Sequence, residues 1–129
     1  MTRGLNKVMV IGHLGRDPEM RFTSGGRPVA AFSVATARGR TDSDGERQEE
    51  IEWFHVVTWG GLAERCKKRL QKGSLVYVEG RLQTRCWEGP DSERLYRTEL
   101  VAQEIIFLSD HENAEESARH HEFDAAGAD

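Results

Sequence analysis

The chain has 129 residues, of which 37% are hydrophobic and 31% charged; this suffices for one domain with a real core and is too short for two comfortable ones. No apolar run reaches the length of a membrane span and no signal-peptide pattern opens the chain, so a cytosolic protein is expected. The two cysteines, Cys66 and Cys86, suggest neither a disulfide framework nor a Cys-x-x-Cys metal site.

The net charge of −4 conceals an uneven distribution of charge. Residues 110–129 hold seven of the 22 acidic residues and one of the 18 basic residues, which leaves residues 1–109 with a net charge of about +2. A near-neutral domain can still bind nucleic acid if its basic residues gather in one groove, because local charge governs the contact. We expect one domain over residues 1–109, followed by an acidic, disordered tail over residues 110–129.

The first third of the chain predicts short β-strands separated by glycine and proline turns. Apolar, β-branched or alternating side chains favour strands at residues 6–14, 20–22 and 28–37. Gly12 predicts a bend within the first strand, Pro18 a turn before the second, and Ser24-Gly25-Gly26 a hairpin after it. The polar residues 38–50 are expected to form a long exposed hairpin loop, mobile unless something binds it.

The stretch from Glu52 to Gly60 holds two of the three tryptophans among residues that favour strands. Side chains alternate along a strand, so Trp53, His55 and Trp59 are expected on one face while the opposite face enters a core. Two indoles with a histidine between them suit the stacking of bases better than catalysis. The alternative is that both indoles belong to the core, as aromatic strand residues usually do.

Residues 62–72 change to a helical period. Leu62, Cys66 and Leu70 form one apolar stripe, the first turn is acidic, the last turns are basic, and Gly73 follows. Cys66 is therefore expected to be a small buried residue of this helix. The basic residues are typical of a solvated face that complements the helix dipole, and only Lys72 is kept as a candidate phosphate contact.

Further strands follow the predicted helix. A long strand at residues 74–87 is expected to bend at Gly80, a turn to occupy residues 88–92, and strand runs to lie at residues 94–100 and 105–108. Short strands, glycine bends and a single helix between the third and fourth long strands favour an all-β fold. We predict a five-stranded oligonucleotide-binding (OB) barrel with long β-hairpin loops, in preference to a sandwich.

Six segments, taken in order and spacing, carry a resemblance to a known family: Asn6-Lys7-Val8, Gly12-x-Leu14-Gly15-x-Asp17-Pro18-Glu19-x-Arg21, Glu52-Trp53-Phe54-x-Val56-Val57, Leu62-Ala63-Glu64, Lys72-Gly73-Ser74-x-Val76-Tyr77-Val78-Glu79-Gly80 and Arg85-x-Trp87. Together they resemble the bacterial single-stranded DNA-binding proteins over roughly residues 1–108. The resemblance implies a homotetramer of OB folds that wraps single-stranded DNA during replication, recombination and repair. It also implies a cytoplasmic, nucleoid-associated protein that performs no chemistry and needs no cofactor.

The resemblance assigns candidate contacts to DNA. The family carries stacking aromatic residues at the positions of Trp53, Trp59 and Trp87, and candidate phosphate or base contacts match Arg3, Lys7, His55, Lys72 and Arg85. Sequence-independent binding needs these two classes of residue, because every base has a π-face and the backbone is anionic. For each of the basic residues, ordinary surface charge is the competing interpretation.

The sequence departs from the family in three respects. Family members often carry another tryptophan where Gly39-Arg40 stands, and some have basic residues at the positions of Gly61, Gln83 and Cys86. The usual acidic Ile-Pro-Phe tip, which docks replication and repair proteins, is absent, although Glu122-Phe123-Asp124 is a candidate degenerate substitute. Replication and repair proteins stay candidate partners, but docking through the usual tip is not expected, and a specialised paralogue is one interpretation.

Other function classes are less favoured. An adaptor of the same family that acts mainly through protein partners remains an alternative, as does a binder of single-stranded RNA, because stacking does not distinguish the two sugars. An enzyme is disfavoured: Lys72-Gly73-Ser74 has the wrong order for a phosphate-binding loop, and no nucleophile elbow appears. His111, His120 and His121 show no recognised metal-ligand spacing, so no metal site is predicted.

Overall fold

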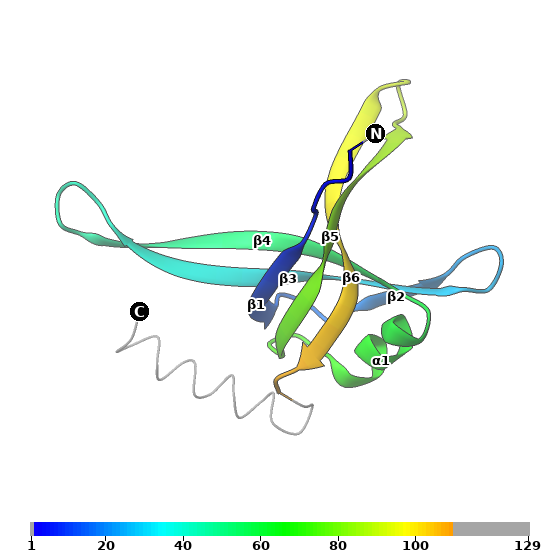
Figure 1. Cartoon of the computed structure of the whole chain (residues 1–129), viewed down its shortest axis with the longest axis horizontal. Helices are drawn as coiled ribbons and strands as arrows, with labels where there is room; N and C mark the ends of the chain where they lie inside the picture. The colour runs from blue at the N-terminus through cyan, green and yellow to red at the C-terminus, as the bar shows by residue number, and fades with distance from the viewer. Residues whose placement is uncertain (1, 110–129) are drawn as a thin grey trace.

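The computed structural model describes residues 2–109, so the expectations for the tail lie outside the described residues. Its strands are β1 (Val8–Leu14), β2 (Glu19–Phe22), β3 (Pro28–Thr41), β4 (Arg47–Trp59), β5 (Leu75–Glu88) and β6 (Arg94–Phe107), with helix α1 (Gly61–Arg69) between β4 and β5. The strand order is β1-β5-β6-β4-β3, and β1 also pairs with β3, which closes a barrel of five strands (Figure 1). The short β2 adds to the edge of β3, and the predicted OB barrel is confirmed.

Closure of the barrel depends on two unusual contacts. β4 and β6 pair in parallel, with Val56 opposite Leu100, while β1 and β3 meet antiparallel through two residue pairs. At this seam a Cβ on Gly12 would lie 2.2 Å from the carbonyl oxygen of Ala35. The seam can form only because residue 12 lacks a side chain, which lets the two backbones approach closely.

The core fills the barrel with inward-facing side chains from every barrel strand. The buried residues that pack together include Val10, Leu14, Phe32, Val34, Val56, Val76, Val78 and Leu100. Helix α1 closes one end of the barrel, where Cys66 and Leu70 join the same cluster. Cys66 is fully buried, as its place on the apolar stripe predicts, and burial raises the pKa of its thiol to about 12.

The predicted helix is confirmed, but it is shorter than its sequence period. It ends at Arg69, because the next residue, Leu70, adopts an extended backbone while its side chain still packs into the core. Lys67 Nζ donates a hydrogen bond to the carbonyl oxygen of Pro18 at 2.9 Å, and the backbone N–H of Lys72 donates to Asp17 Oδ1 at 2.8 Å. The helix region therefore fixes the turn that joins β1 to β2.

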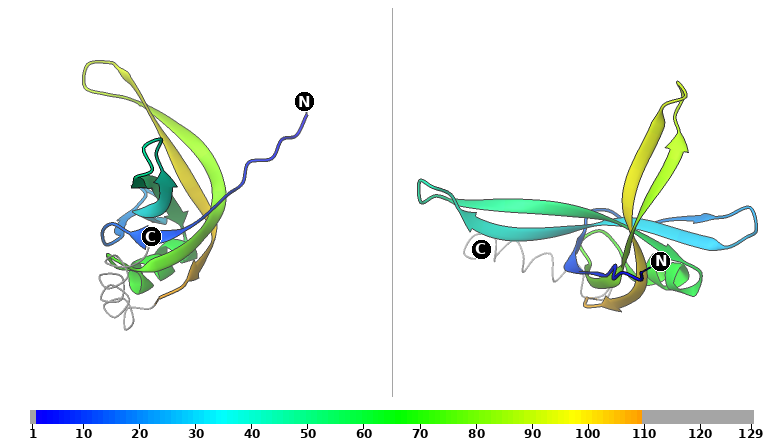
Figure 2. Two further views of the ribbon diagram at one scale, coloured as in Figure 1. Left: turned by 90° about the vertical axis from the view of Figure 1, so that its left-hand side faces the viewer. Right: turned by 45° about the horizontal axis from the view of Figure 1, so that its top comes forward.

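Three hairpins project from the barrel as arms, formed by β2–β3, β3–β4 and β5–β6 (Figures 1 and 2). Most of residues 38–50 are exposed, as expected, but they do not form an open loop. Pairing between β3 and β4 continues from Val29 opposite Trp59 to Thr41 opposite Arg47, so only residues 42–46 form the tip. Backbone hydrogen bonding continues outward from the barrel although the arm has no apolar side chains in this segment. Ion pairs of Glu50 with Arg38 (3.6 Å) and Arg40 (3.0 Å) link the two strands of the arm.

The β5–β6 arm bends where the sequence indicates. The register of the pair shifts between Glu79 and Gly80, which separates the part of β5 that lies in the barrel from the part that forms the arm. β6 is one continuous strand through both of the apolar runs that were expected. Along the arm, Arg85 lies opposite Arg97 and Trp87 opposite Leu95, so these four residues share one face of the ribbon.

Candidate nucleic-acid interface

A continuous groove crosses the barrel surface along β4. Two cavities of about 360 and 890 Å³ adjoin here, because Glu19, Ala31 and His55 line both of them. The smaller cavity is bounded by Trp53 and the turn after β1, and the larger one by Trp59, the β2–β3 arm and the base of the β5–β6 arm. We call the combined depression the groove.

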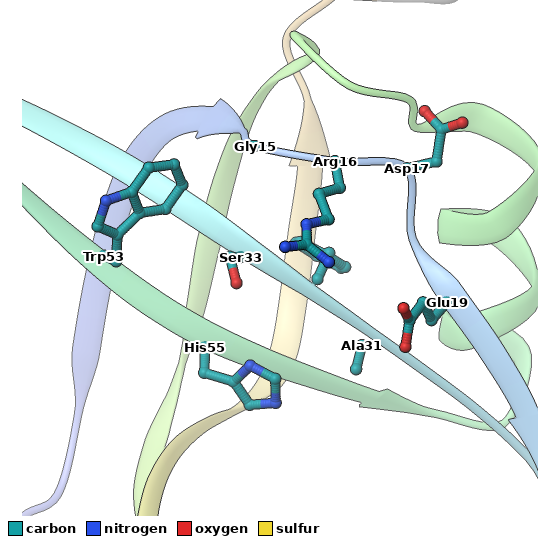
Figure 3. Close-up of a pocket in the computed structure, with 9 residues that line it drawn as sticks. Gly15, Arg16, Asp17, Glu19, Ala31, Ser33, Trp53 and His55 are labelled. Carbon is teal, nitrogen blue, oxygen red and sulfur yellow. The ribbon is translucent and has the colours of Figure 1, made fainter.

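Alternation along β4 places its functional side chains in the groove. Trp53 and His55 line the smaller cavity, while His55, Val57 and Trp59 line the larger one, as predicted for one strand face. Figure 3 shows Trp53 and His55 reaching the pocket from β4, with Arg16 and Glu19 across from them. Thr58, on the opposite face, is fully buried, and its hydroxyl donates to the carbonyl oxygen of Ala30 at 2.9 Å. The strand thus has one core face and one groove face.

All three indoles are partly open to solvent, with 57% of Trp53, 37% of Trp59 and 38% of Trp87 exposed. None of them belongs to the buried cluster that fills the barrel, so the alternative that Trp53 and Trp59 are core residues is wrong. Trp53 lies against the backbone of Gly15, where a Cβ would stand 2.7 Å from the ring carbon Cζ3. The contact holds the indole at one edge of its six-membered ring and leaves most of the residue exposed, so that a base can stack on it.

Arginine side chains lie over the other two indoles. The guanidinium carbon of Arg27 lies 4.9 Å from the centroid of the Trp59 ring. Those of Arg85 and Arg97 lie 5.5 and 5.9 Å from the centroid of the Trp87 ring. Each pairing brings a cation and a stacking surface together, which suits a ligand with alternating aromatic and anionic parts.

Sequence reasoning missed several basic residues that the fold brings to the groove: Arg21, Arg27, Arg81 and Arg97. Arg81 could have been found from the sequence, since it precedes Arg85 by four positions and strand alternation places both on one face. Arg97 depends on the register of β5 with β6, which sets it opposite Arg85. Arg27 depends on the position of the β2–β3 arm beside Trp59, and no local sequence pattern indicates it.

Glu99 places one carboxylate among these cations. Its side chain is only 6% exposed, and it lies 3.5 Å from His55 Nε2 through one oxygen and 3.9 Å from Arg85 Nε through the other. The pKa of His55 is lowered, first because the ring is partly buried and then because Arg97 and Arg85 are nearby, although Glu99 and Glu19 oppose the shift. His55 is therefore mostly neutral at pH 7.

The remaining predicted contacts lie outside the lining of the groove. Lys72 is exposed next to the turn after β1, to which its backbone is bonded. Lys7 pairs with Glu79 at 3.7 Å on the β1–β5 surface, and Arg3 is an exposed residue before β1. The structure thus brings together His55 and Arg85 in the groove and places Trp87 beside Arg85, but it does not bring Arg3, Lys7 or Lys72 to the same place.

Further features of residues 2–109 concern metal ligands, cysteines and long apolar helices. Residues 2–109 contain no group of three histidine, cysteine or acidic residues arranged to hold a metal ion, and the three histidines of the tail lie outside the described residues. Both cysteines are free thiols, with Cys66 buried and Cys86 exposed. Within the same residues, no helix is long and apolar enough to cross a membrane.

Comparison with known proteins finds one matching family and several similar sequences. Residues 5–108 match the family described as Single-strand binding protein family. The chain is 50% identical over 109 residues to Single-stranded DNA-binding protein 1 of Chlorobaculum tepidum, covering 84% of this chain and 67% of that protein. It is 44% identical over 108 residues to the Single-stranded DNA-binding protein of Xanthomonas axonopodis pv. citri, covering 84% of this chain and 60% of that protein.

Two solved structures resemble the fold. A chain from the Plasmodium falciparum SSB complex with ssDNA superposes with a TM-score of 0.78 at 33% identity, covering 84% of this chain and 99% of the other. A deletion mutant of the single-stranded DNA binding protein from Thermus aquaticus gives a TM-score of 0.74 at 35% identity, covering 86% of this chain and 54% of the other.

Proposed function

Since the chain belongs to the single-strand binding protein family, we propose that it binds single-stranded DNA without sequence preference and without catalysis. The groove supports this function through stacking surfaces and cations. The observation that carries the proposal is the set of three partly exposed indoles, each seated on backbone or beside a guanidinium. The named relatives are single-stranded DNA-binding proteins, and one solved neighbour is a complex with single-stranded DNA.

The mechanism follows from the residues along the groove. Bases stack on the open faces of Trp53, Trp59 and Trp87, each contact contributing about 1–3 kcal/mol. Arg27, Arg97 and the other groove arginines neutralise the phosphates that join those bases, so affinity falls as salt rises. Arg3, Lys7 and Lys72 extend the cationic surface beyond the groove in this proposal, and His55 and Arg85 contact the strand inside it.

We place the DNA-binding unit in residues 1–109 and propose that it works as a homotetramer. The barrel surface on β1, β5 and β6 supports association, because Met9, Ile11 and Ile106 are 62%, 57% and 46% exposed there. Ile11 lies opposite Tyr77, which in turn lies opposite Ile106. An apolar band of this kind on a sheet is typical of a protein–protein contact. Substitution of Ile11 by lysine should lower the mass measured by light scattering.

The cellular role proposed is protection of single strands during replication, recombination and repair, in the cytoplasm at the nucleoid. Protein partners from those processes are part of the same proposal. The chain spans about three fifths to two thirds of the length of its named relatives, so partner binding is proposed for the family in general rather than for a particular segment of this chain.

The direct test is quenching of tryptophan fluorescence by oligo(dT), with duplex DNA of equal length as the control, at low and moderate salt. Quenching by the single strand alone that weakens with salt supports the proposal. Trp87→Ala should weaken binding, whereas Tyr96→Ala is the matched control: Tyr96 is 63% exposed and lies on the same arm, opposite Cys86 on the other ribbon face. Equal losses in the two variants would count against stacking.

Two outcomes would favour the alternatives. If neither DNA quenches the fluorescence, the family adaptor that acts mainly through protein partners becomes the better interpretation. If oligo(U) competes with oligo(dT) at equal concentration, the protein binds single-stranded RNA as well, since the stacking surfaces do not distinguish the sugars.

A further inference from the structure

A buried carboxylate in the floor of the groove has no role in the mechanism above. Glu99 lies on β6 opposite Gln83 of β5, and both residues line the larger cavity. Only 5% of the residue is exposed. Burial of a charged carboxylate is costly unless it is paired, and Glu99 has one oxygen near the Arg85 guanidinium and the other near the His55 ring.

The two partners of Glu99 differ in their freedom to move. The side chain of Arg85 is 54% exposed, whereas that of His55 is 31% exposed and that of Glu99 is 6% exposed. Arg85 can therefore turn toward solvent, or toward a phosphate, while Glu99 stays in the floor. When Arg85 turns away, Glu99 loses a counter-charge at a depth where solvent screens charges weakly.

We propose that Glu99 limits the affinity of the groove for single-stranded DNA and moderates the salt dependence of binding. Glu99 neutralises Arg85 in the free protein, and a phosphate must replace Glu99 as the partner of Arg85 when DNA binds. This inference rests on the proposed function. The exchange leaves the carboxylate facing the incoming polyanion, which opposes binding. The deprived Glu99 also attracts a cation from solution, and this uptake offsets part of the cation release that drives binding.

The exchange predicts a link between DNA binding and protonation of His55. The charged groups that face His55 are Arg97 and Glu99 on β6, Arg85 on β5 and Glu19 on β2. Engagement of the arginines by phosphates removes two influences that keep the ring neutral, while Glu99 remains beside it. His55 then accepts a proton more readily in the complex than in the free protein, so binding should strengthen as the pH falls below about 6.5.

The test is the Glu99→Gln substitution, which keeps the shape of the side chain and removes its charge. Affinity for oligo(dT) is measured by tryptophan quenching across a salt series near neutral pH. We expect binding at about 50 mM salt to tighten by roughly three- to tenfold, and the slope of log K against log salt to steepen by about 0.7, the value for one further phosphate neutralised on a single strand. The pH dependence of binding below about 6.5 should also become flatter.

Glu64→Gln is the control, because Glu64 is exposed on α1 and does not line the groove; it should leave affinity and slope unchanged. Equal or weaker binding by Glu99→Gln with an unchanged slope would overturn the inference. In that case, quenching of the unmodified protein by oligo(dT) would show that the proposed function itself still stands.

A second variant covers the case in which Glu99→Gln does not fold. Arg85→Gln leaves Glu99 without its mobile partner, so it should reduce affinity more than Arg81→Gln, whose side chain bonds to Gln83 Oε1 at 2.9 Å instead of to a carboxylate. A loss of affinity at least about threefold larger for Arg85→Gln than for Arg81→Gln supports the inference, because the uncompensated Glu99 carboxylate then repels the DNA. Equal losses would contradict it.

Discussion

One edge of the Trp53 indole packs against the backbone of Gly15: a Cβ at residue 15 would stand 2.7 and 2.8 Å from the ring carbons Cζ3 and Cη2. The N–H of Gly15 donates to the carbonyl oxygen of Ser33 at 3.1 Å, which ties the turn after β1 to β3. Trp53 projects from β4, the neighbour of β3. Three segments distant in sequence therefore fix one edge of the indole, while 57% of the residue stays exposed.

Gly15→Ala should therefore damage DNA binding more than folding. The new methyl group must push the indole off its seat, because the glycine backbone is bonded in place, and the displaced ring loses its stacking geometry. We expect a loss of roughly five- to fiftyfold in affinity for oligo(dT), within the range of one lost stack. Fluorescence titration measures the affinity, and thermal unfolding checks stability. Gly25→Ala is the control, as its nearest neighbour atom would lie 3.9 Å away.

Gly12→Ala, in contrast, should lower the stability of the fold more than the affinity for DNA. Its Cβ would stand 2.2 Å from the carbonyl oxygen of Ala35, and neither backbone can retreat without opening the β1–β3 seam. Overpacking of a rigid site usually costs about 1–3 kcal/mol of unfolding free energy, and we expect the upper end or more. Chemical denaturation measures the change. A variant as stable as the unmodified protein would show that the seam tolerates separation.

Much of the fold was accessible from the sequence because it depends on local pattern. Alternation along Trp53 to Trp59 gave the correct core and groove faces of β4, and the four-residue apolar spacing identified α1. The β3–β4 arm was not accessible in the same way. Its polar residues have no alternating pattern, and only the register inherited from the barrel keeps them paired out to Thr41 and Arg47.

The residues of the candidate site also fall into two groups: those that local sequence predicts and those that depend on tertiary placement. The three tryptophans and His55 lie on strands whose faces a sequence pattern can assign. Arg27 and Arg97 reach the indoles through tertiary placement and strand register, which no single stretch of sequence encodes. Glu99 was missed for a related reason: an acidic residue in a sequence is usually solvated, and the burial of Glu99 beside His55 and Arg85 depends on three strands.

The two thiols should differ sharply in reactivity, and the difference provides a probe of the β5–β6 arm. Burial raises the pKa of Cys66 to about 12, and its side chain is enclosed by the core, whereas Cys86 is exposed. A thiol reagent at about pH 8 should modify one cysteine in the native protein and two after denaturation. Modification of both thiols at equal rates in the native protein would contradict the packing of α1.

Labelling of Cys86 should also leave DNA binding largely intact. Cys86 pairs with Tyr96, and Trp87 with Leu95, so the label lies on the ribbon face away from the indole and its two arginines. We expect a change of less than about threefold in affinity for oligo(dT), because no stacking or phosphate contact is removed. A labelled protein that no longer binds would indicate that both faces of the arm contact DNA.

The stability of the free protein should decline in mild acid partly because of His55. Its pKa in the folded state lies below the ordinary value of 6.5, through partial burial and then the positive charge of Arg97. Above that value the ring is neutral in both the folded and the unfolded chain, so it contributes no pH dependence. As the pH falls below it, the unfolded chain binds a proton that the folded chain resists, and the free energy of unfolding therefore falls.

His55→Gln should remove this contribution, because glutamine cannot be protonated in this range. The melting temperatures of the variant and the unmodified protein should differ by a constant amount between about pH 7 and 8. Between about pH 6.5 and 5 the difference should move in favour of the variant. Carboxylates that titrate lower affect both proteins alike and cancel in the comparison. If the melting temperatures of the two proteins still differ by the same amount at about pH 5, the folded ring is protonated as easily as the unfolded one. Glu99 would then offset the effects that lower the pKa of His55.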